Sequence, residues 1–454
     1  MLMIGYLMYI NIWQADDLNS NAYNTKQDAN MDKYIRGSIL SSDGQVLAQT
    51  TVTDSGEEIR EYPYANVFSH VIGYASNGKA GLEASSNRDL LSSHASVLTQ
   101  IRDESDSEKT RGDSVVVTLN AALQQAAYDA LGSYNGAVVA MEPDTGKILA
   151  MVSKPDYDPN EIESMWESLI TDSSSSVLLN RATQGLYPPG STFKILTTLA
   201  YMRQEPSEFR DFQFDCTSEL TVEDVTIHCY NNAAHGQEDL KGALAHSCNT
   251  AFAEIGLGLD NDEFHSLCEE FLFNKSLPTD MQHSTSQFVL DGDSSYGEVM
   301  TTSIGQGDTL MTPLHMALIT STVANGGIMM RPYYVDRIET YDGDTVSRTN
   351  PSRYKRLMTT EEAALLTEYM QETVASGTAT ALGWYDFTAA GKTGSAEYVS
   401  NGYEGTHSWF TGFSNVENPD LVVTVIAEDG GTGSETAVPI AAQVFQAYYS
   451  IYGY

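Results

Sequence analysis

The sequence is poor in positive charge. It has 24 lysine and arginine residues against 61 aspartate and glutamate residues, which gives a formal net charge of −37 at pH 7. Such a charge repels nucleic acids and anionic lipid surfaces at long range, so we expect no nucleic-acid partner. The acidic residues are scattered between apolar segments and are not gathered in one tail, which indicates the solvated surface of a globular protein.

Cysteine is also scarce. The chain has 4 cysteines in 454 residues, too few for a scaffold built on disulfides. No pair of them shows the spacing of zinc ligands with histidines nearby, so we expect no metal site. Cys216 and Cys229 flank "TSELTVEDVTIH", in which alternating residues predict a strand or hairpin. Two alternatives stay open for this pair, a local disulfide formed outside the cytoplasm or two unpaired thiols.

No hydrophobic run in the sequence reaches the length of about 20 residues that crosses a bilayer. The nearest is the N-terminal "MLMIGYLMYINIW", which no basic residue precedes. We expect residues 1–15 to be the outer part of a truncated membrane anchor. The alternative is a buried or interfacial helix.

The sequence also has no internal repeats. Changes in its composition suggest a smaller first module and a larger second domain. The segment "RGSILSSDGQVLA" at 36–48 predicts two short strands around a Ser-Asp-Gly turn. It lies in a first module, which we place at 16–112. The polar stretch 92–113 has no hydrophobic pattern and predicts a hairpin or linker. A larger domain then covers 113–454.

The larger domain has strand patterns at both ends and a mostly helical middle. Such an order predicts an α+β domain, in which distant segments assemble one sheet and helices pack on its faces. The predicted strands are 114–119, 136–143, 146–153, 407–414 and 421–429, and the predicted terminal helices are 120–134, with an N-cap, and 436–453, with a proline near its first turn.

A serine and a lysine in "YPPGSTFKIL", residues 187–196, are candidates for covalent chemistry. Two prolines and a glycine exclude a helix interior before Ser191, so we expect a helix to begin near it. Lys194 then returns to the same helix face, where its amine can reach the serine oxygen. A nucleophile beside a base is what covalent catalysis requires, although a Ser-x-x-Lys quartet alone also arises by chance.

An ordinary lysine is charged at neutral pH and cannot accept a proton, so Lys194 needs burial or a nearby cation to lower its pKa. A second lysine stands in "AAGKTGSAEY", where Lys392, Thr393 and Gly394 follow one another in a predicted strand. Between the two lysines lies "AHSCNTAF", with Ser247 and Asn249 on either side of a cysteine.

The order Ser-x-x-Lys, Ser-x-Asn, Lys-Thr-Gly is the motif set of penicillin-binding proteins and serine β-lactamases. With "NRATQGLYPPGSTFK", "SIGQGDTLMTPLHMALITSTVANGG" and "HSWFTGFS", the sequence resembles the class B penicillin-binding transpeptidases over most of residues 113–445. The resemblance implies a transpeptidase domain of the penicillin-binding-protein and β-lactamase type, an α+β fold with a central, mainly antiparallel sheet and helices on both faces. A small mixed N-terminal module precedes it.

The same resemblance implies roles for the motif residues. Ser191 would attack the D-Ala-D-Ala carbonyl and form an acyl-enzyme, Lys194 would remove its proton, and Ser247 would relay a proton to the leaving D-alanine. Asn249, Lys392, Thr393 and Gly394 would bind the substrate, and the charge of Lys392 would lower the pKa of Lys194. The backbone N–H groups of Ser191 and Ser395 would form the oxyanion hole.

The expected activity is that of a peptidoglycan D,D-transpeptidase that cross-links stem peptides and is inhibited covalently by β-lactams, with no cofactor. The resemblance implies four partners: D-Ala-D-Ala donors, amine acceptors, β-lactam antibiotics and a polytopic membrane glycosyltransferase. It implies a single-pass anchor in the cell membrane with the catalytic domain outside the cytoplasm. The alternatives are a serine β-lactamase, a β-lactam sensor or silent scaffold, and a D,D-carboxypeptidase.

Overall fold

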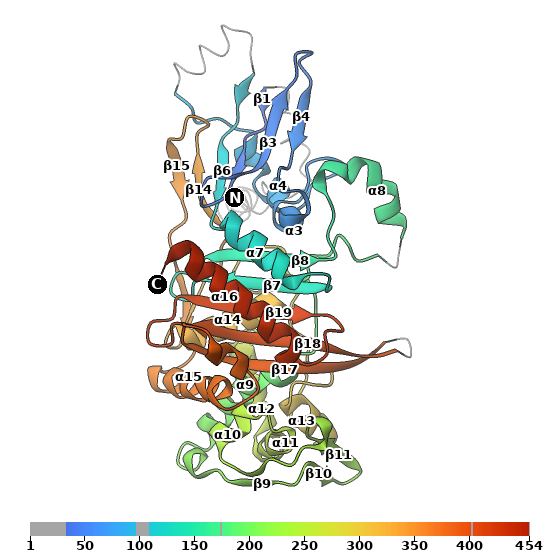
Figure 1. Ribbon diagram of the computed structural model, residues 1–454, viewed down its shortest axis with the longest axis vertical. Helices are drawn as coiled ribbons and strands as arrows, with labels where there is room; N and C mark the ends of the chain where they lie inside the picture. Colours follow the sequence, from blue (N-terminus) through green and yellow to red (C-terminus); the bar gives the residue numbers. More distant parts are fainter. Residues whose placement is uncertain (1–32, 97–108, 173–174, 401–402, 454) are drawn as a thin grey trace, which may run out of the picture. The chain divides into compact units, whose positions relative to one another are not determined.

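The structure of the protein is a computed structural model that describes residues 33–96, 109–172, 175–400 and 403–453 (Figure 1). The expected anchor at 1–15 lies outside these residues, as does the 97–108 part of the expected linker. Of the helices in the described ranges, none has both the length and the apolar composition that a membrane crossing requires.

The chain forms two compact units, each built from segments that are distant in sequence. The first unit comprises residues 1–124, 155–179 and 334–350, and the second comprises 125–154, 180–333 and 351–454. This division differs from the single boundary at 112 that the sequence suggested. Composition could not reveal it, because residues 334–350 join the first unit through strand pairing, which composition does not record.

The first unit is organised around a six-stranded sheet with the order β15-β14-β6-β2-β3-β4. Strands β2 and β6 run parallel, and the other neighbours are antiparallel. The predicted hairpin at 36–48 is therefore confirmed as β2 and β3. The sheet strands are β2 (Ile39–Leu40), β3 (Val46–Val52), β4 (Glu58–Glu61), β6 (Ser114–Val117), β14 (Val335–Glu339) and β15 (Thr345–Arg348).

Short helices complete the first unit, and a buried charge cluster lies among them. Glu83 has no exposed surface and accepts hydrogen bonds from Arg36 and Arg60 at 2.5 and 2.7 Å. These two arginines hold the pKa of Glu83 below its usual value against the opposing effect of its burial. The remaining elements are β1 (Tyr34–Ile35), η3 (Ala65–Phe68), α3 (Ser69–Ile72), α4 (Gly81–Ser85), α5 (Asn87–Leu90), β5 (Thr110–Arg111), η4 (Pro159–Glu161) and α8 (Ile162–Thr171); α7 (Ala121–Leu131) passes from the first unit into the second.

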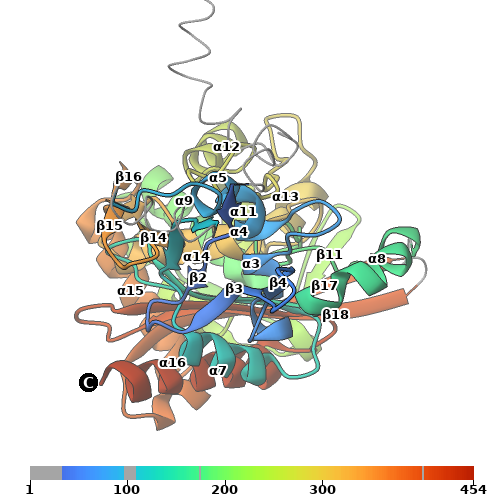
Figure 2. The ribbon, with the colours of Figure 1, turned by 90° about the horizontal axis from the view of Figure 1, so that it is seen from above.

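The second unit contains a five-stranded sheet, β17-β18-β19-β7-β8, in which every neighbouring pair is antiparallel. Every residue of β7 and β19 is buried, because helices cover both faces. Helix α14 (Pro313–Ala324) contacts one face and α16 (Val438–Tyr452) the other (Figure 2). The predicted α+β fold is confirmed. Its strands are β7 (Gly136–Met141), β8 (Ile148–Lys154), β17 (Ala389–Ser400), β18 (Tyr403–Ser414) and β19 (Leu421–Ala427).

The middle of the second unit is mainly helical, as predicted. The short strands β9, β10, β11 and β12, whose ranges are given below, form a small polar part of it. The helix expected near Ser191 begins as the 3-10 turn η5 (Gly190–Phe193) and continues as α9 (Lys194–Gln204). The other elements are η6 (Phe209–Asp211), β9 (Phe214–Cys216), β10 (Glu219–Val222), β11 (Val225–His228), η7 (Tyr230–Asn232), β12 (Gly236–Glu238), α10 (Leu240–Ala245), α11 (Asn249–Gly258), α12 (Asn261–Glu270), α13 (Tyr296–Ser303), β13 (Ile328–Met330), β16 (Arg353–Arg356), α15 (Thr360–Ala375), η8 (Thr380–Trp384) and η9 (Gly433–Ala437).

Candidate active site

Ser191 lies in the tight turn η5, directly after a glycine in a left-handed conformation. Gly190 has a φ of 54°, and its N–H donates to the carbonyl of Gly305 at 2.9 Å. A Cβ at this position would lie 2.9 Å from the carbonyl oxygen of Ser395 on β17. Only glycine therefore allows the turn to approach the strand this closely. The approach brings Ser191 to the edge strand of the sheet, and its side chain stays partly exposed.

Aromatic side chains fix the segment around this turn. Trp409 on β18 is fully buried and donates from Nε1 to the carbonyl of Pro188 at 3.0 Å. Two residues after the serine, Phe193 packs against Phe264, Phe273 and Phe288 with ring centroids 5.8 to 5.9 Å apart. A nucleophile held between two buried aromatic anchors has a defined position, as a reacting group requires.

Lys194 is fully buried at the start of α9. Its Nζ donates to the Ser247 carbonyl at 2.9 Å and to Asn249 Oδ1 at 2.7 Å, and it lies 3.4 Å from Ser247 Oγ. Burial lowers the pKa of Lys194 to about 8. A lysine with this pKa exists partly as the free amine near neutral pH and can act as a base.

Ser247 lies in the turn between α10 and α11, and Asn249 is the first residue of α11. Ser247 has a φ of 59°, which is uncommon for a residue with a side chain. Cys248 is the N-cap of α11, where its sulfur accepts from the N–H of Ala251 at 3.5 Å. The Asn249 amide donates to the carbonyl of His228 at 2.9 Å, which ties the turn to the end of β11.

Lys392 is fully buried on β17, and its Nζ donates to Ser247 Oγ and to the carbonyl of Thr393, both at 2.9 Å. Burial first, and then the charge of Lys194, lower the pKa of Lys392 well below its usual value. Burial is the main cause of the lowered pKa at both lysines, and the mutual repulsion of the two amines disfavours a state in which both are charged. One hydroxyl, that of Ser247, lies within hydrogen-bond distance of both lysine amines.

The other motif residues of β17 follow Lys392 along the strand. Thr393 is buried, and its hydroxyl lies 2.5 Å from the hydroxyl of Thr378. A Cβ on Gly394 would lie 3.0 Å from Trp409 Cβ and 3.1 Å from the Pro189 carbonyl oxygen, so a side chain there is crowded. Ser395 Oγ accepts from the N–H of Gly433 at 3.3 Å.

The structure brings Lys194, Ser247, Asn249 and Lys392 into one hydrogen-bonded group, and η5 with Ser191 contacts β17 with Thr393, Gly394 and Ser395. Sequence reasoning missed Thr378, the hydroxyl partner of Thr393. Thr378 follows α15, the helix that packs on β17. No sequence pattern indicates that a residue in this position contacts Thr393.

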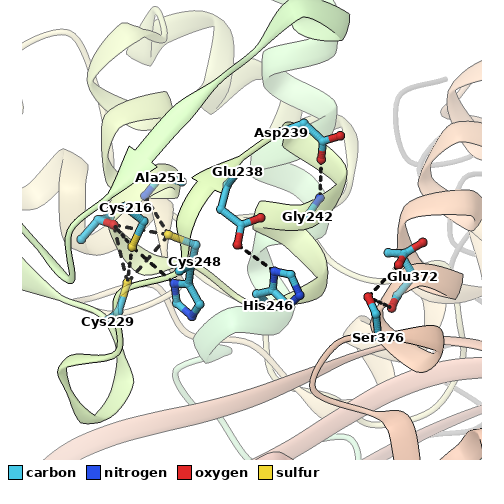
Figure 3. Close-up of polar contacts among 12 residues, drawn as sticks. Cys216, Cys229, Glu238, Asp239, Gly242, His246, Cys248, Ala251, Glu372 and Ser376 are labelled. Atoms are coloured by element: carbon cyan, nitrogen blue, oxygen red, sulfur yellow. Dashed lines mark hydrogen bonds and ion pairs between the residues drawn. The ribbon is translucent and has the colours of Figure 1, made fainter.

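The disulfide considered for Cys216 and Cys229 is absent. All four cysteines of the sequence fall in the described ranges and are free, and the two sulfurs lie 3.6 Å apart, well beyond the bond length of about 2.05 Å. The two thiols instead belong to a group with His235 and Cys248, whose side chains could together hold a metal ion. Sequence reasoning missed this group, whose cysteines are shown in Figure 3, because its members are too far apart along the chain for a short zinc motif.

Two family models match the chain. The model described as "Penicillin binding protein transpeptidase domain" matches residues 136–446, and the one described as "Penicillin binding protein A dimerisation domain" matches residues 36–115. The first match contains every motif residue named above, and it covers more than half of the chain.

The chain is similar to characterised relatives over nearly its whole length. The peptidoglycan D,D-transpeptidase PbpA of Mycolicibacterium smegmatis is 33% identical, over 98% of this chain and 95% of the relative. PbpA of Mycobacterium tuberculosis is 34% identical, over 96% and 93%. A solved ceftriaxone acyl-enzyme complex of M. tuberculosis penicillin-binding protein A has a TM-score of 0.84 at 32% identity, over 93% of this chain and 99% of that chain. A D,D-transpeptidase domain structure from Eggerthella lenta has a TM-score of 0.83 at 32% identity, with the same coverage.

Proposed function

We propose, since the chain belongs to the penicillin-binding protein transpeptidases, that its buried pair of lysines drives serine acylation by peptidoglycan stem peptides. The protein is a serine D,D-transpeptidase of the PbpA-like, class B type. The proposed mechanism rests on the position of the Ser247 hydroxyl, which lies 2.9 Å from Lys392 Nζ and 3.4 Å from Lys194 Nζ. This contact links a base, a hydroxyl and a second amine in one proton path.

Acylation begins at Ser191. The free amine of Lys194 takes the hydroxyl proton while the serine oxygen attacks the carbonyl carbon between the two D-alanines. Negative charge then develops on the carbonyl oxygen, where the N–H groups of Ser191 and Ser395 stabilise it. The carbon–nitrogen bond breaks, the leaving D-alanine nitrogen receives a proton from Ser247, and the lysine pair restores that proton.

Transpeptidation completes the cycle. The amine of a second stem peptide attacks the ester carbon, the serine–carbonyl bond breaks, and the Ser191 oxygen recovers a proton. Lys392 and Thr393 provide positive charge and a hydroxyl for the carboxylate of the donor, and Asn249 provides an amide for its backbone. Gly394 acts indirectly, because the absence of a side chain lets the segment that carries Ser191 lie against β17.

β-Lactams react at the same serine. The strained amide of the drug replaces the D-alanine peptide bond, and the resulting ester lasts when no group activates water to hydrolyse it. The related M. tuberculosis protein has been solved as acyl-enzyme complexes with ceftriaxone, imipenem and penicillin G. These complexes favour a lasting adduct in this chain over rapid β-lactamase turnover.

We extend the proposal to the cellular location of the protein and to a partner enzyme. The substrate of a peptidoglycan transpeptidase lies outside the cytoplasmic membrane, so the catalytic domain belongs there too. The apolar segment within residues 1–15 supports a single-pass anchor. Cross-linking uses glycan strands that another reaction must supply, and we propose a polytopic membrane glycosyltransferase for that role.

The test supplies the full chain with glycan strands that carry uncross-linked stem peptides ending in D-Ala-D-Ala. Chromatography with mass spectrometry follows cross-linked muropeptides and free D-alanine. We expect both products from the wild type, neither from Ser191→Ala, and both from Ser450→Ala, which changes an exposed serine on α16. Free D-alanine without cross-links would replace the proposal with D,D-carboxypeptidation. The absence of both products would overturn it.

A further inference from the structure

Strand β17 is the edge strand of its sheet, and among the described strands only β18 pairs with it (Figure 1). The free edge of a strand offers backbone N–H and C=O groups to any extended peptide that lies beside it. On an antiparallel strand only every second residue directs these groups to a given side. Ser395, whose N–H we assign to the oxyanion hole, and Glu397 are two residues of this spacing, and the backbone of each contacts the side chain of Gln306.

The side chain of Gln306 closes part of this edge. The partners of its amide fix its orientation, because the oxygen accepts from the Glu397 N–H at 3.1 Å and the nitrogen donates to the Glu397 carbonyl at 3.3 Å. The Ser395 carbonyl oxygen lies 3.5 Å from the same amide. A side-chain amide that makes two hydrogen bonds with one residue of an edge strand takes the place of a residue in an added strand.

The end of helix α13 fixes the backbone of Gln306. The N–H of Gly305 donates to the carbonyl of Thr302 at 2.8 Å, and the N–H of Gln306 donates to that of Thr301 at 2.9 Å. These two bonds, with Gly305 at a φ of 82°, form a Schellman motif. The side chain that contacts β17 therefore comes from a backbone position that the helix end holds.

The same helix end also contacts the segment of the nucleophile. The Gly305 carbonyl accepts from the N–H of Gly190 at 2.9 Å, and a Cβ on Gly305 would lie 1.9 Å from the Gly190 carbonyl oxygen. Gln306 thus reaches β17 from a loop that lies directly against the residue before Ser191. A donor peptide bound at this serine meets the part of the edge that Gln306 closes.

The motif residues fix the direction in which a donor peptide runs along β17. Its terminal carboxylate binds at Lys392 and Thr393, and its scissile carbonyl accepts from the N–H of Ser395. The donor is therefore antiparallel to β17, and the residues before the penultimate D-alanine extend toward Glu397. In regular antiparallel pairing, the residue two positions before that D-alanine would exchange hydrogen bonds with Glu397. Gln306 already occupies this place.

We propose that Gln306 is a specificity-determining residue that ends the pairing of the donor peptide with β17 at Ser395. The donor keeps its hydrogen bonds around the penultimate D-alanine, and the residues before it turn away from the strand. The enzyme then selects donors by their last residues and tolerates variation further back. Because only a donor held at Ser191 meets Gln306, this role rests on the proposed function.

Two synthetic donors that differ by one methyl group test this role. The first is N-acetyl-Ala-Gly-Ala-D-Ala joined to thioglycolate, which keeps a terminal carboxylate and carries a thioester. Attack by the serine oxygen on the thioester carbon releases thioglycolate, whose thiol is measured by its colour reaction. In the second donor sarcosine replaces glycine, which removes the one N–H that would donate to the Glu397 carbonyl. The ratio of kcat/KM for the glycine donor to that for the sarcosine donor measures the use of this edge.

We expect this ratio to lie within about two-fold of 1 in the wild type and in Gln443→Ala, which changes an exposed glutamine on α16. In Gln306→Ala the edge is open, so the glycine donor should be favoured at least about five-fold, the effect of one hydrogen bond. Gln306→Met keeps the length of the side chain without its hydrogen bonds, and it should give the same result if the alanine variant fails to fold. A merely structural role would lower kcat/KM for both donors equally and leave the ratio unchanged.

A wild-type ratio of about five or more would overturn the proposal, because the donor would then pair with Glu397 in spite of Gln306. Ratios near 1 in folded Gln306 variants would overturn it as well, and so would a wild type that fluorescent penicillin labels but the thioesters do not acylate. Failure of the proposed function gives a different result. In that case neither penicillin nor the thioesters would react at Ser191.

Hydrogen exchange tests the contact itself without any reaction. The N–H of Glu397 should be protected in the wild type, because it donates to Gln306. In Gln306→Ala it should exchange at least about five-fold faster, while the N–H groups of β19, inside the sheet, keep their rates. Equal exchange of the Glu397 N–H in the two proteins would overturn the proposal.

Discussion

The two sides of the active site are supported in different ways. Lys392, Thr393 and Gly394 lie on the edge strand β17, where they pair with a fully buried part of the neighbouring strand β18. Ser247 precedes α11 and Asn249 begins it. This segment is linked to residues 214–238, which we call the polar lobe and in which Ile227 is the only buried aliphatic or aromatic side chain among the described residues. The first side rests on apolar burial. The second rests on hydrogen bonds and on the group of thiols and imidazole.

This comparison shows that different interactions can stabilise the two sides of one active site. Apolar burial contributes about 25 cal/mol for each Å² removed from water and does not depend on ions or redox conditions. A group of buried thiols depends on redox conditions. Each prediction below is therefore directed at one side of the site or at the place where the two sides meet.

The largest effect is expected where the two sides meet, at the lysines. Lys194→Ala removes the amine that we propose as acceptor of the Ser191 proton, so acylation by penicillin should fall about 10³-fold, within the range for loss of a general base. The measurement is the second-order acylation rate constant. Lys241→Ala, which changes a partly exposed lysine paired with Glu368, is the matched control. A Lys194→Ala protein that acylates at the wild-type rate would disprove the role of this base.

Stability should separate the sheet from the polar lobe. Phe410 is fully buried on β18, and Phe410→Ala should lower the free energy of unfolding by about 3 to 5 kcal/mol. Tyr230 in the polar lobe is 58% exposed, and Tyr230→Ala should change it by less than about 0.5 kcal/mol. Urea unfolding measures both. Similar losses for the two variants would contradict the distinction between the two sides.

The pH dependence of acylation should report the lysine pair. Burial lowers the pKa of Lys194 to about 8, and the base must be unprotonated to act. The acylation rate should therefore rise about ten-fold for each pH unit below 8 and level off above it. Stopped-flow acylation between pH 6 and 9, with stability checked at each pH, measures this. A rate that falls as the pH rises would contradict the assignment of Lys194 as the base.

The smallest effect is expected on β17 itself. Thr393→Ser keeps the hydroxyl that lies 2.5 Å from Thr378 Oγ1 and should change acylation less than about two-fold. Thr393→Val removes the hydroxyl but keeps the shape, and loss of one hydrogen bond to a charged substrate group should slow acylation about ten-fold. The comparison uses the same penicillin assay. Equal rates for serine and valine would show that the hydroxyl does not bind the carboxylate.

Much of the fold was predictable because its segments are strongly patterned. The predicted strands at 136–143, 146–153, 407–414 and 421–429 are confirmed as β7, β8, β18 and β19. The terminal helix is confirmed as α16, with Pro439 in its first turn. Local rules suffice for such elements, since each carries its own apolar pattern and its own end signals.

What the sequence could not reveal depends on contacts between distant segments. The addition of residues 334–350 to the first unit depends on the pairing of β14 with β6. The group formed by three cysteines and His235 depends on the return of β12 beside β9, where Gly236 pairs with Cys216. In the candidate site, the motifs identified the residues, but burial as the main cause of the lowered pKa of Lys194 became visible only with the packing around it.

The most direct measurement is mass spectrometry of the intact chain after benzylpenicillin, followed by peptide mapping. The mechanism predicts one penicilloyl group per chain, located on the peptide that contains Ser191, stable for hours and absent from Ser191→Ala. An adduct on any other residue, or destruction of the drug without a lasting adduct, would contradict the mechanism. An unmodified protein beside intact benzylpenicillin would contradict it as well.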